Sequence, residues 1–412
     1  MNRRSLLSSG LLLAGGTLVA ASRGAAAVPK MKIRRIRYYE PPRVNPTFNQ
    51  SDRIVTIETD AGITGIGEGG SKDMLDQCAA MLIGEDPSRI EHLWQFMYRG
   101  WFYPPGREKL HALGALDMAL WDIKGKALGV PVYELLGGLA RQHIECYSSG
   151  VGRGETLREK AQAVIEAGFR AYRTAVDMPW SEQGGGGPPT GVFRPRQAVD
   201  QEVEKARQIR EGVGKDGDWL TDVHTRLDLP DAIRLCSLLE PFAPYEVEDP
   251  LRSENKGIYE QLRPHIKVPI AVGEQFGDRW DSNELIERRL IDYLRVTLPN
   301  TGGITEFMKI AALCETHNVG MIPHATGPIS LAALTHTLGV FPGPVLMECG
   351  GVPKPPYLPQ GVDFRNGKLW PRDAPGLGVE FDSTRASLLS DISERLAPTP
   401  LYRRPDGSIT NW

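Results

Sequence analysis

Several features that mark other classes of protein are missing from this sequence of 412 residues. No uninterrupted apolar run approaches the roughly 18 residues that cross a membrane, so we expect no stable membrane anchor. Lysine and arginine total 48 against 51 aspartate and glutamate residues, so no basic excess exists to bind nucleic acid. The five cysteines are widely spaced without a C-x-x-C motif, and neither a zinc site nor a disulfide framework is indicated. The remaining composition, 41% hydrophobic and 24% charged, is typical of a globular protein.

The first 27 residues differ from the rest of the chain. Arg3 and Arg4 precede a mildly apolar stretch, and Ala25, Ala26 and Ala27 supply the small residues of a cleavage site. This pattern is typical of a twin-arginine export signal, so we expect a periplasmic or otherwise exported protein. The alternative is a frayed N-terminal helix.

Residues 31–138 have an α+β pattern. The stretches MKIRRIRYYE and DRIVTIETD alternate apolar and polar residues as half-buried strands do, and the following Asp60, Ala61 and Gly62 predict a turn into ITGIGEG. In HALGALDMALWDIKGKALG, apolar residues recur at intervals of three and four, which predicts a helix ended by Gly129. This segment is too small to enclose a substrate alone, so we interpret it as a capping domain.

Residues 139–350 follow a different pattern, in which eight short apolar runs alternate with seven helical stretches. The alternation predicts an α/β fold with a parallel (β/α) barrel. An open doubly wound sheet is the alternative, but it needs a glycine-rich phosphate loop after its first strand, and GVGRGE fits that motif poorly.

Two further segments complete the chain. Residues 351–412 are proline-rich, as in VPKPPYLP, and we expect them to pack back on the cap. Residues 176–196, between the second strand and its helix, include four consecutive glycines. In a barrel this loop lies on the catalytic face, where it is either a mobile lid or a tolerated flexible insertion.

Three acidic residues recur at one repeat length. Asp222 ends the run WLTD, Glu248 ends YEVE and Glu274 ends IAVGE, so successive acids are 26 residues apart. Barrel enzymes carry their chemistry at the carboxyl ends of strands that lie about 4.8 Å apart, so these side chains should converge. A hard divalent cation such as Mg²⁺ relieves the repulsion among them. The alternative, that each acid caps the following helix, is disfavoured because all three are in register.

Other chemically active residues fall at the remaining strand ends. His224 lies just past the first of these acids and should face the same side of an extended chain, while His324 ends GMIPH and Glu348 ends VLME. Arg173 and Arg295, on the second and sixth strands, face the same mouth. They either clamp an anionic substrate or neutralise the neighbouring acids.

These motifs resemble the enolase superfamily, in particular its mandelate racemase/muconate lactonizing enzyme-like branch and the acid-sugar dehydratases within it. The resemblance extends from about residue 31 to 382 and rests on ALDMALWDIKGKALGVPVYELLGG, DVH, VEDP, VGEQ, TGGIT, PHATGP and MECGG. It implies an N-terminal α+β cap on a (β/α)7β TIM-like barrel, a homo-oligomer, and a small-molecule carboxylate substrate.

The resemblance also implies a role for each strand-end residue. In this family the three acids bind Mg²⁺, the seventh-strand histidine is the acid or base, and the D-x-H histidine helps a β-hydroxyl leave. The residues that match the metal ligands are Asp222, Glu248 and Glu274. His324 and His224 match the acid/base pair. The substrate-binding group is matched by Arg173, Arg295 and Glu348.

The sequence departs from the family pattern at the base. Lysine-using members carry K-x-K on the second strand, where this chain has Arg173 and Ala175. Members that orient the seventh-strand histidine with an aspartate carry it where this chain has Thr297. Arg173, Arg295 and Thr297 resemble the mannonate and gluconate dehydratase group, whose active members use a loop tyrosine that residues 176–196 do not contain.

The expected reaction is Mg²⁺-dependent dehydration of an aldonic or aldaric acid to a 2-keto-3-deoxy acid. A hydrogen α to a carboxylate is too weakly acidic for a side chain alone, and a bound Mg²⁺ stabilises the enediolate that forms. Two alternatives stay open. One is another enolate reaction, such as one-base epimerisation of a hydroxy acid, and the other is a catalytically weak barrel that binds a carboxylate.

Overall fold

The structure is a computed structural model that describes residues 27–42, 53–100, 102–103, 106–149, 152–176, 192–352, 354–396 and 401–410. The expected export signal therefore lies almost wholly outside the described residues, as does most of the glycine-rich loop of residues 176–196. Within the described ranges, no helix is long and apolar enough to cross a membrane.

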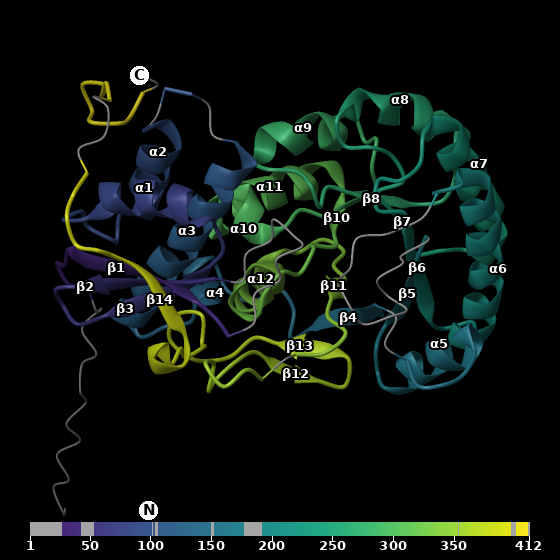
Figure 1. The fold of residues 1–412 in the computed structure, drawn as a ribbon, viewed down its shortest axis with the longest axis horizontal. Coiled ribbons are helices and arrows are strands. Elements are labelled where there is room, and N and C mark those ends of the chain that lie inside the picture. The colour runs from purple at the N-terminus through teal and green to yellow at the C-terminus, as the bar shows by residue number, and fades with distance from the viewer. Residues whose placement is uncertain are drawn as a thin grey trace, which may run out of the picture.

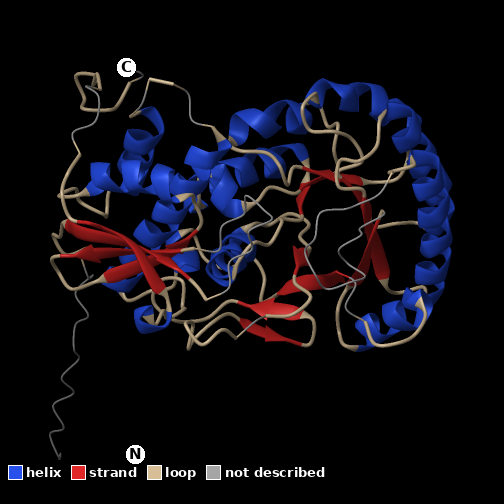
Figure 2. Cartoon of the chain, viewed as in Figure 1, coloured by secondary structure: helices blue, strands red, loops and turns tan. Residues whose placement is uncertain are grey.

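The N-terminal region is a small sheet covered by helices, as the capping prediction requires (Figures 1 and 2). An antiparallel meander turns at Gly62, whose φ is 76°, and α3 ends at Gly129, whose φ is 70°. Gly65 and Gly67 let α3 approach the sheet, because a Cβ atom at either would run into the α3 backbone. The elements are β1 (Ile33–Glu40), β2 (Ile54–Thr59), β3 (Thr64–Glu68), α1 (Lys72–Leu82), α2 (Ile90–Arg99), α3 (Arg107–Leu128) and α4 (Val132–Leu135).

The central region is the predicted barrel of eight parallel strands. Its strands are β4 (Ile144–Ser149), β5 (Ala171–Ala175), β6 (Asp218–Asp222), β7 (Glu246–Glu248), β8 (Ile270–Val272), β9 (Tyr293–Leu294), β10 (Gly320–Met321) and β11 (Met347–Glu348). The connecting helices are α5 (Leu157–Glu166), α6 (Pro195–Val213), α7 (Leu229–Leu239), α8 (Tyr259–Leu262), α9 (Arg279–Glu287), α10 (Leu298–Thr301), α11 (Ile304–His317) and α12 (Pro328–Val340). The ring closes because β11 pairs with β4 and Met321 bridges Val345.

The C-terminal segment contacts both parts. It forms β12 (Asp363–Arg365), β13 (Lys368–Trp370) and β14 (Ser387–Ile392). Strand β14 pairs antiparallel with β1 and becomes the fourth strand of the cap sheet. The C-terminal segment thus packs on the cap as expected, but it also contacts the barrel. There β13 pairs with the first residues of β4 and extends the barrel sheet.

The barrel has a packed floor beneath its mouth. Six side chains from the barrel strands and the segments adjoining them form one apolar cluster and are at most 1% exposed: Tyr147, Ala171, Leu220, Ala271, Ile322 and Leu346. Polar residues at the strand ends lie above this cluster, which fills the barrel interior as is usual for this architecture.

Two buried acids fasten the cap to the barrel. Asp117 of α3 accepts hydrogen bonds at 2.9 Å from the Thr305 amide and at 2.6 Å from its hydroxyl, at the start of α11. Glu68 of β3 accepts hydrogen bonds at 2.8 and 2.7 Å from the amides of Ile329 and Ser330, in the first turn of α12. Carboxylates at helix N-termini satisfy backbone donors that have no partner inside the helix.

Candidate active site and metal centre

The mouth of the barrel gathers acidic residues from neighbouring strands. Ligand atoms of Glu248, Asp249 and Glu274 lie within 4.8 Å of one another, and Glu248 and Asp249 are buried. Burial is the main reason why the pKa of Glu248 rises to about 7, and nearby carboxylates add to the shift. Glu274 differs, because His324, Arg295 and His224 outweigh its burial and lower its pKa. Glu248 and Glu274 are thus brought together as the sequence predicts.

Asp222, the first of the predicted metal ligands, stands beside this cluster rather than inside it. It is paired in register with Glu248 on the next strand, yet Arg173 Nη1 lies between them, 3.5 Å from Asp222 Oδ2 and 2.7 Å from Glu248 Oε2. Asp222 is 1% exposed, its Oδ1 has no hydrogen-bond partner, and burial raises its pKa to about 6. A buried oxygen without a partner is costly, which suits an atom that receives a ligand.

The two arginines at the mouth are used differently. Arg295 is fully buried, and its guanidinium binds Glu248, the Tyr147 hydroxyl at 2.7 Å and Glu348 Oε2 at 2.6 Å. It has no surface with which to clamp a substrate, so the geometry favours the neutralising role. Arg173 is 11% exposed and contacts Glu348 at 2.8 Å, so it can face a ligand.

Glu348 is held as an anion by these arginines. Burial opposes its ionisation, but Arg173 and Arg295 outweigh that effect and keep its pKa below the usual range. The Ser149 hydroxyl donates a further hydrogen bond at 3.0 Å. Glu348 is therefore fixed in place at the closure of the barrel.

The two predicted acid/base histidines meet at one carboxylate oxygen. His224 Nε2 and His324 Nε2 each lie 3.8 Å from Glu274 Oε1. The backbone at His224 is left-handed, with a φ of 55°, so the chain is not extended there. The sequence does not reveal this conformation. The expectation of an extended chain after Asp222 is therefore wrong, although its side chain still arrives at the mouth.

Thr297 contacts His324 and the strand end that carries Glu274. Its hydroxyl donates to the Glu274 carbonyl at 3.3 Å and lies 3.1 Å from His324 Nδ1. When the hydroxyl gives its one proton to the Glu274 carbonyl, Nδ1 is the atom that carries the hydrogen in the second pair. In that tautomer the lone pair is on Nε2, the atom that lies 3.8 Å from Glu274 Oε1.

The sequence analysis missed two acids near the predicted ligands. Asp249 accepts a hydrogen bond from the Gly273 amide at 3.1 Å and belongs to the carboxylate cluster. The second acid of the VEDP motif could have indicated it. Glu246 lies two residues before Glu248, is fully buried, and has no hydrogen-bond partner on either oxygen. Burial, with Glu248 nearby, raises its pKa well above the usual value and so favours its uncharged form. The proposed lid, residues 176–196, lies mostly outside the described residues.

The donor set of the mouth fits a hard divalent cation. Carboxylate oxygens are the ligands that Mg²⁺ prefers, and here several are buried close together with one oxygen unpartnered. Asp222, Glu248 and Glu274 would hold such a cation, with Asp249 close to the last two. With a cation held there, the site could stabilise negative charge on a substrate carboxylate next to the imidazoles of His224 and His324.

Comparison with known proteins agrees with this architecture. Residues 40–137 match the model of the mandelate racemase/muconate lactonizing enzyme N-terminal domain, and residues 156–385 match the enolase C-terminal domain-like model. A crystal structure of an enolase superfamily member from Salmonella Typhimurium has a TM-score of 0.78 and 26% sequence identity, covering 88% of this chain and all of that one.

Two curated relatives are similar over nearly their whole length. The chain is 36% identical over 404 residues to a D-galactonate dehydratase of Ralstonia pickettii, covering 93% of this chain and 100% of the relative. It is 35% identical over 386 residues to a D-mannonate dehydratase of Caulobacter sp., covering 86% and 94%. The protein described here therefore belongs to the mandelate racemase/muconate lactonizing enzyme family of the enolase superfamily.

Proposed function

We propose that this protein is a Mg²⁺-dependent dehydratase of an aldonic or aldaric acid. The observation that carries the proposal is the position of Glu274, whose Oε1 lies 3.8 Å from Nε2 of both His224 and His324. A carboxylate able to hold a cation is thereby flanked by two groups able to move protons. The full-length similarity to D-galactonate and D-mannonate dehydratases supports the same class of reaction.

Metal binding is assigned to Asp222, Glu248 and Glu274. When bound, Mg²⁺ supplies positive charge beside the substrate carboxylate and makes the α-hydrogen easier to remove. Arg173 and Glu348 supply the charged and polar contacts to the substrate. Arg295 holds Glu248 and Glu348 in place from below.

His324 acts as the base in this proposal. Its Nδ1 hydrogen is directed at Thr297, so the Nε2 lone pair can take the α-proton of the substrate. His224 then gives a proton to the β-hydroxyl, the carbon–oxygen bond breaks, and water leaves. The resulting enol takes a proton at the β-carbon and becomes a 2-keto-3-deoxy acid.

A direct test is a screen of the protein with Mg²⁺ against a library of aldonic and aldaric acids. We expect Mg²⁺-dependent formation of a 2-keto acid from at least one of them, abolished by EDTA and restored by added Mg²⁺. A protein that binds these acids in the presence of metal but turns none over would contradict the proposal.

Proton exchange without elimination is a second candidate activity, and the state of His224 favours it. Burial lowers the pKa of His224, so a neutral imidazole faces the leaving group at neutral pH. In D₂O an epimerase would place deuterium in recovered substrate without net loss, whereas a dehydratase consumes the substrate. Measuring deuterium incorporation and substrate loss in D₂O therefore separates the two activities.

Export is a separate part of the proposal. Arg3 and Arg4, ahead of the small residues Ala25 to Ala27, support passage through the twin-arginine pathway. We expect the full chain to reach the periplasm of a bacterial host and the variant with lysine at both arginine positions to stay in the cytoplasm. Equal distribution of the two proteins on cell fractionation would remove this assignment.

A further inference from the structure

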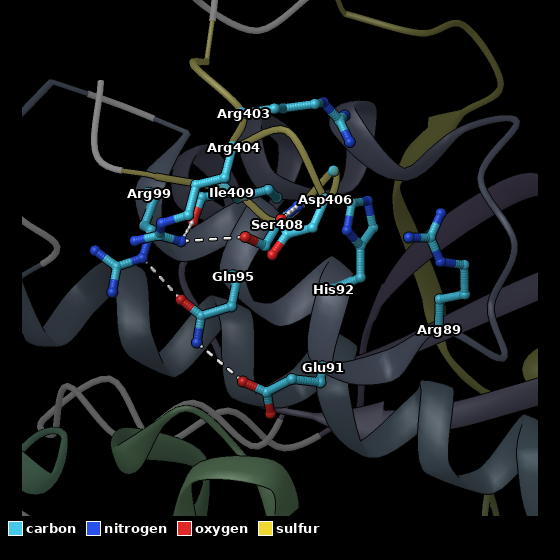
Figure 3. Close-up of a pocket in the computed structure, with 11 residues that line it drawn as sticks. Arg89, Glu91, His92, Gln95, Arg99, Arg403, Arg404, Asp406, Ser408 and Ile409 are labelled. Carbon is cyan, nitrogen blue, oxygen red and sulfur yellow. Dashed lines mark hydrogen bonds between the residues drawn. The ribbon is translucent and has the colours of Figure 1, made fainter.

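A second concave site lies on the cap, away from the barrel mouth. It is a cleft of about 660 Å³ between α2 and the C-terminal hairpin of residues 401–410 (Figure 3). In Figure 1, α2 and the chain end lie at the opposite end of the long axis from β5 and β6. No residue assigned to the active site lines this cleft.

The hairpin that forms one wall is fixed in position. Arg403 and Ile409 form an antiparallel bridge, and Gly407, with a φ of 84°, allows the turn between them. Ile409 is 7% exposed and packs against Met81 and Phe96 of the cap. The packing holds the two arginines at 403 and 404 over the exposed side of α2.

The cleft concentrates positive charge on a chain whose formal charge is −3. Its lining contains four arginines and two acids, a formal charge of +2. The arginines are Arg89, Arg99, Arg403 and Arg404, and the acids are Glu91 and Asp406.

The two acids of the lining balance the arginines only in part, with Asp406 near Arg404. Both Glu91 oxygens lie 2.8 Å from Lys309 Nζ, and Asp406 accepts the Ser408 amide at 2.9 Å. Within the described part of the chain, Arg89, Arg403 and Arg404 form no ion pair with a carboxylate. Positive charges from two distant segments are thus brought together in one cleft, where they raise the local concentration of anions.

The arginines stand in two groups along the cleft. Figure 3 shows Arg99 and Arg404 at one end, where Arg404 also bonds the Ser408 hydroxyl at 3.2 Å. Arg89 and Arg403 lie at the other end beside His92. Burial lowers the pKa of His92, and the two neighbouring arginines lower it further. The lining at this end is therefore positive, with a neutral imidazole between two guanidinium groups.

We propose that this cleft binds a triphosphate group, carried by an inorganic polyphosphate or a nucleotide. Guanidinium groups match phosphate oxygens with paired hydrogen bonds, and two separated pairs of arginines suit an extended chain of phosphates better than a single one. The half-buried His92 adds a donor once an anion raises its pKa. This site is independent of the dehydratase proposal, because no active-site residue takes part.

The test uses the full-length protein in metal-free buffer, with tripolyphosphate as the probe and calorimetry as the readout. We expect tripolyphosphate to bind at least ~10-fold more tightly than orthophosphate. ATP is the second probe. If ATP and tripolyphosphate bind with equal affinity, the cleft recognises the phosphates alone. If ATP binds more tightly than tripolyphosphate, the ligand is a nucleotide. Equal affinity for tripolyphosphate and orthophosphate would overturn the proposal.

Variants locate the binding. The double variant Arg89→Gln/Arg403→Gln should weaken tripolyphosphate binding at least ~10-fold, whereas Arg252→Gln, at an exposed arginine outside the cleft, should leave it unchanged. Since Arg89 and Arg403 are exposed, we expect both variants to fold, and circular dichroism checks this. In the unmodified protein, NMR should show the pKa of His92 rising when tripolyphosphate is added. An unchanged affinity in the double variant, or an unmoved His92, would contradict the assignment.

Discussion

The buried carboxylates at the barrel mouth and those along the seam between cap and barrel are satisfied differently. In the seam, both oxygens of Asp117 accept hydrogen bonds from Thr305, and Glu68 accepts two backbone amides of α12. At the mouth, Glu248 lies beside other acids and accepts hydrogen bonds from two arginines, and Asp222 leaves one oxygen without a hydrogen-bond partner.

A raised pKa does not distinguish the two regions. Burial raises the pKa of Asp117 to about 7, which is close to the values of Asp222 and Glu248. The difference lies in the direction of the oxygens. An acid turned to the amides at a helix N-terminus stabilises the fold, whereas acids gathered close together around cationic side chains form a place for a cation.

The largest effect should come from removing a carboxylate at the mouth. We expect Glu274→Gln to lower kcat/KM for the sugar-acid substrate by at least ~10³-fold, because the metal loses a ligand and both histidines lose their carboxylate. Steady-state kinetics with Mg²⁺ measure this, and Glu254→Gln, at an exposed acid paired with Arg252, is the matched control. Retention of activity in Glu274→Gln would place the metal elsewhere.

Replacing a histidine should separate proton transfer from metal binding. His324→Asn should lower kcat by ~10²–10⁴-fold, the usual contribution of a general base, and leave Mg²⁺ affinity nearly unchanged. Kinetics and metal titration of the same preparation measure both quantities. Full activity in this variant would show that another group takes the α-proton.

A change in the seam should affect stability rather than catalysis. Asp117→Asn replaces one acceptor of Thr305 by a donor, so we expect the free energy of unfolding to fall by about 1–3 kcal/mol. Denaturant unfolding measures the loss, and kcat/KM of the folded protein should stay within about twofold. A large drop in kcat/KM without a change in stability would contradict the claim that the seam acids stabilise the fold and the mouth acids serve catalysis.

The smallest effect should be a pH dependence of metal stabilisation. The pKa of Asp222 is about 6 and that of Glu248 about 7, both above ordinary values near 4, so these acids keep protons in the folded state. Their contribution to stability without metal is present below about pH 4 and is lost as the pH rises through 6 to 7. Mg²⁺ binds the ionised form, so it should raise Tm by a few degrees more at pH 8 than at pH 5.5. A Mg²⁺-induced shift that shrinks with rising pH would contradict this.

The fold was largely predictable because its signals are periodic. Alternation marks the cap strands, apolar runs followed by acids mark β6, β7 and β8, and the spacing of Asp222, Glu248 and Glu274 follows the barrel repeat. Each of these patterns depends on local backbone geometry, which the sequence carries directly.

The details of the site were less predictable because they depend on contacts between distant segments. No spacing reveals that Arg173 lies between Asp222 and Glu248, or that Arg295 is fully buried. The left-handed backbone at His224 also overrides the expectation of an extended chain. The pairing of β13 with β4 is likewise a tertiary contact that composition could not indicate.

Calorimetric titration with Mg²⁺ of the unmodified protein, Glu248→Gln and Asp117→Asn tests the central claim most directly. We expect one Mg²⁺ per chain in the unmodified protein and in Asp117→Asn, and an affinity at least ~10-fold lower in Glu248→Gln. Equal Mg²⁺ affinity in all three proteins would contradict the assignment of the metal centre to the barrel mouth.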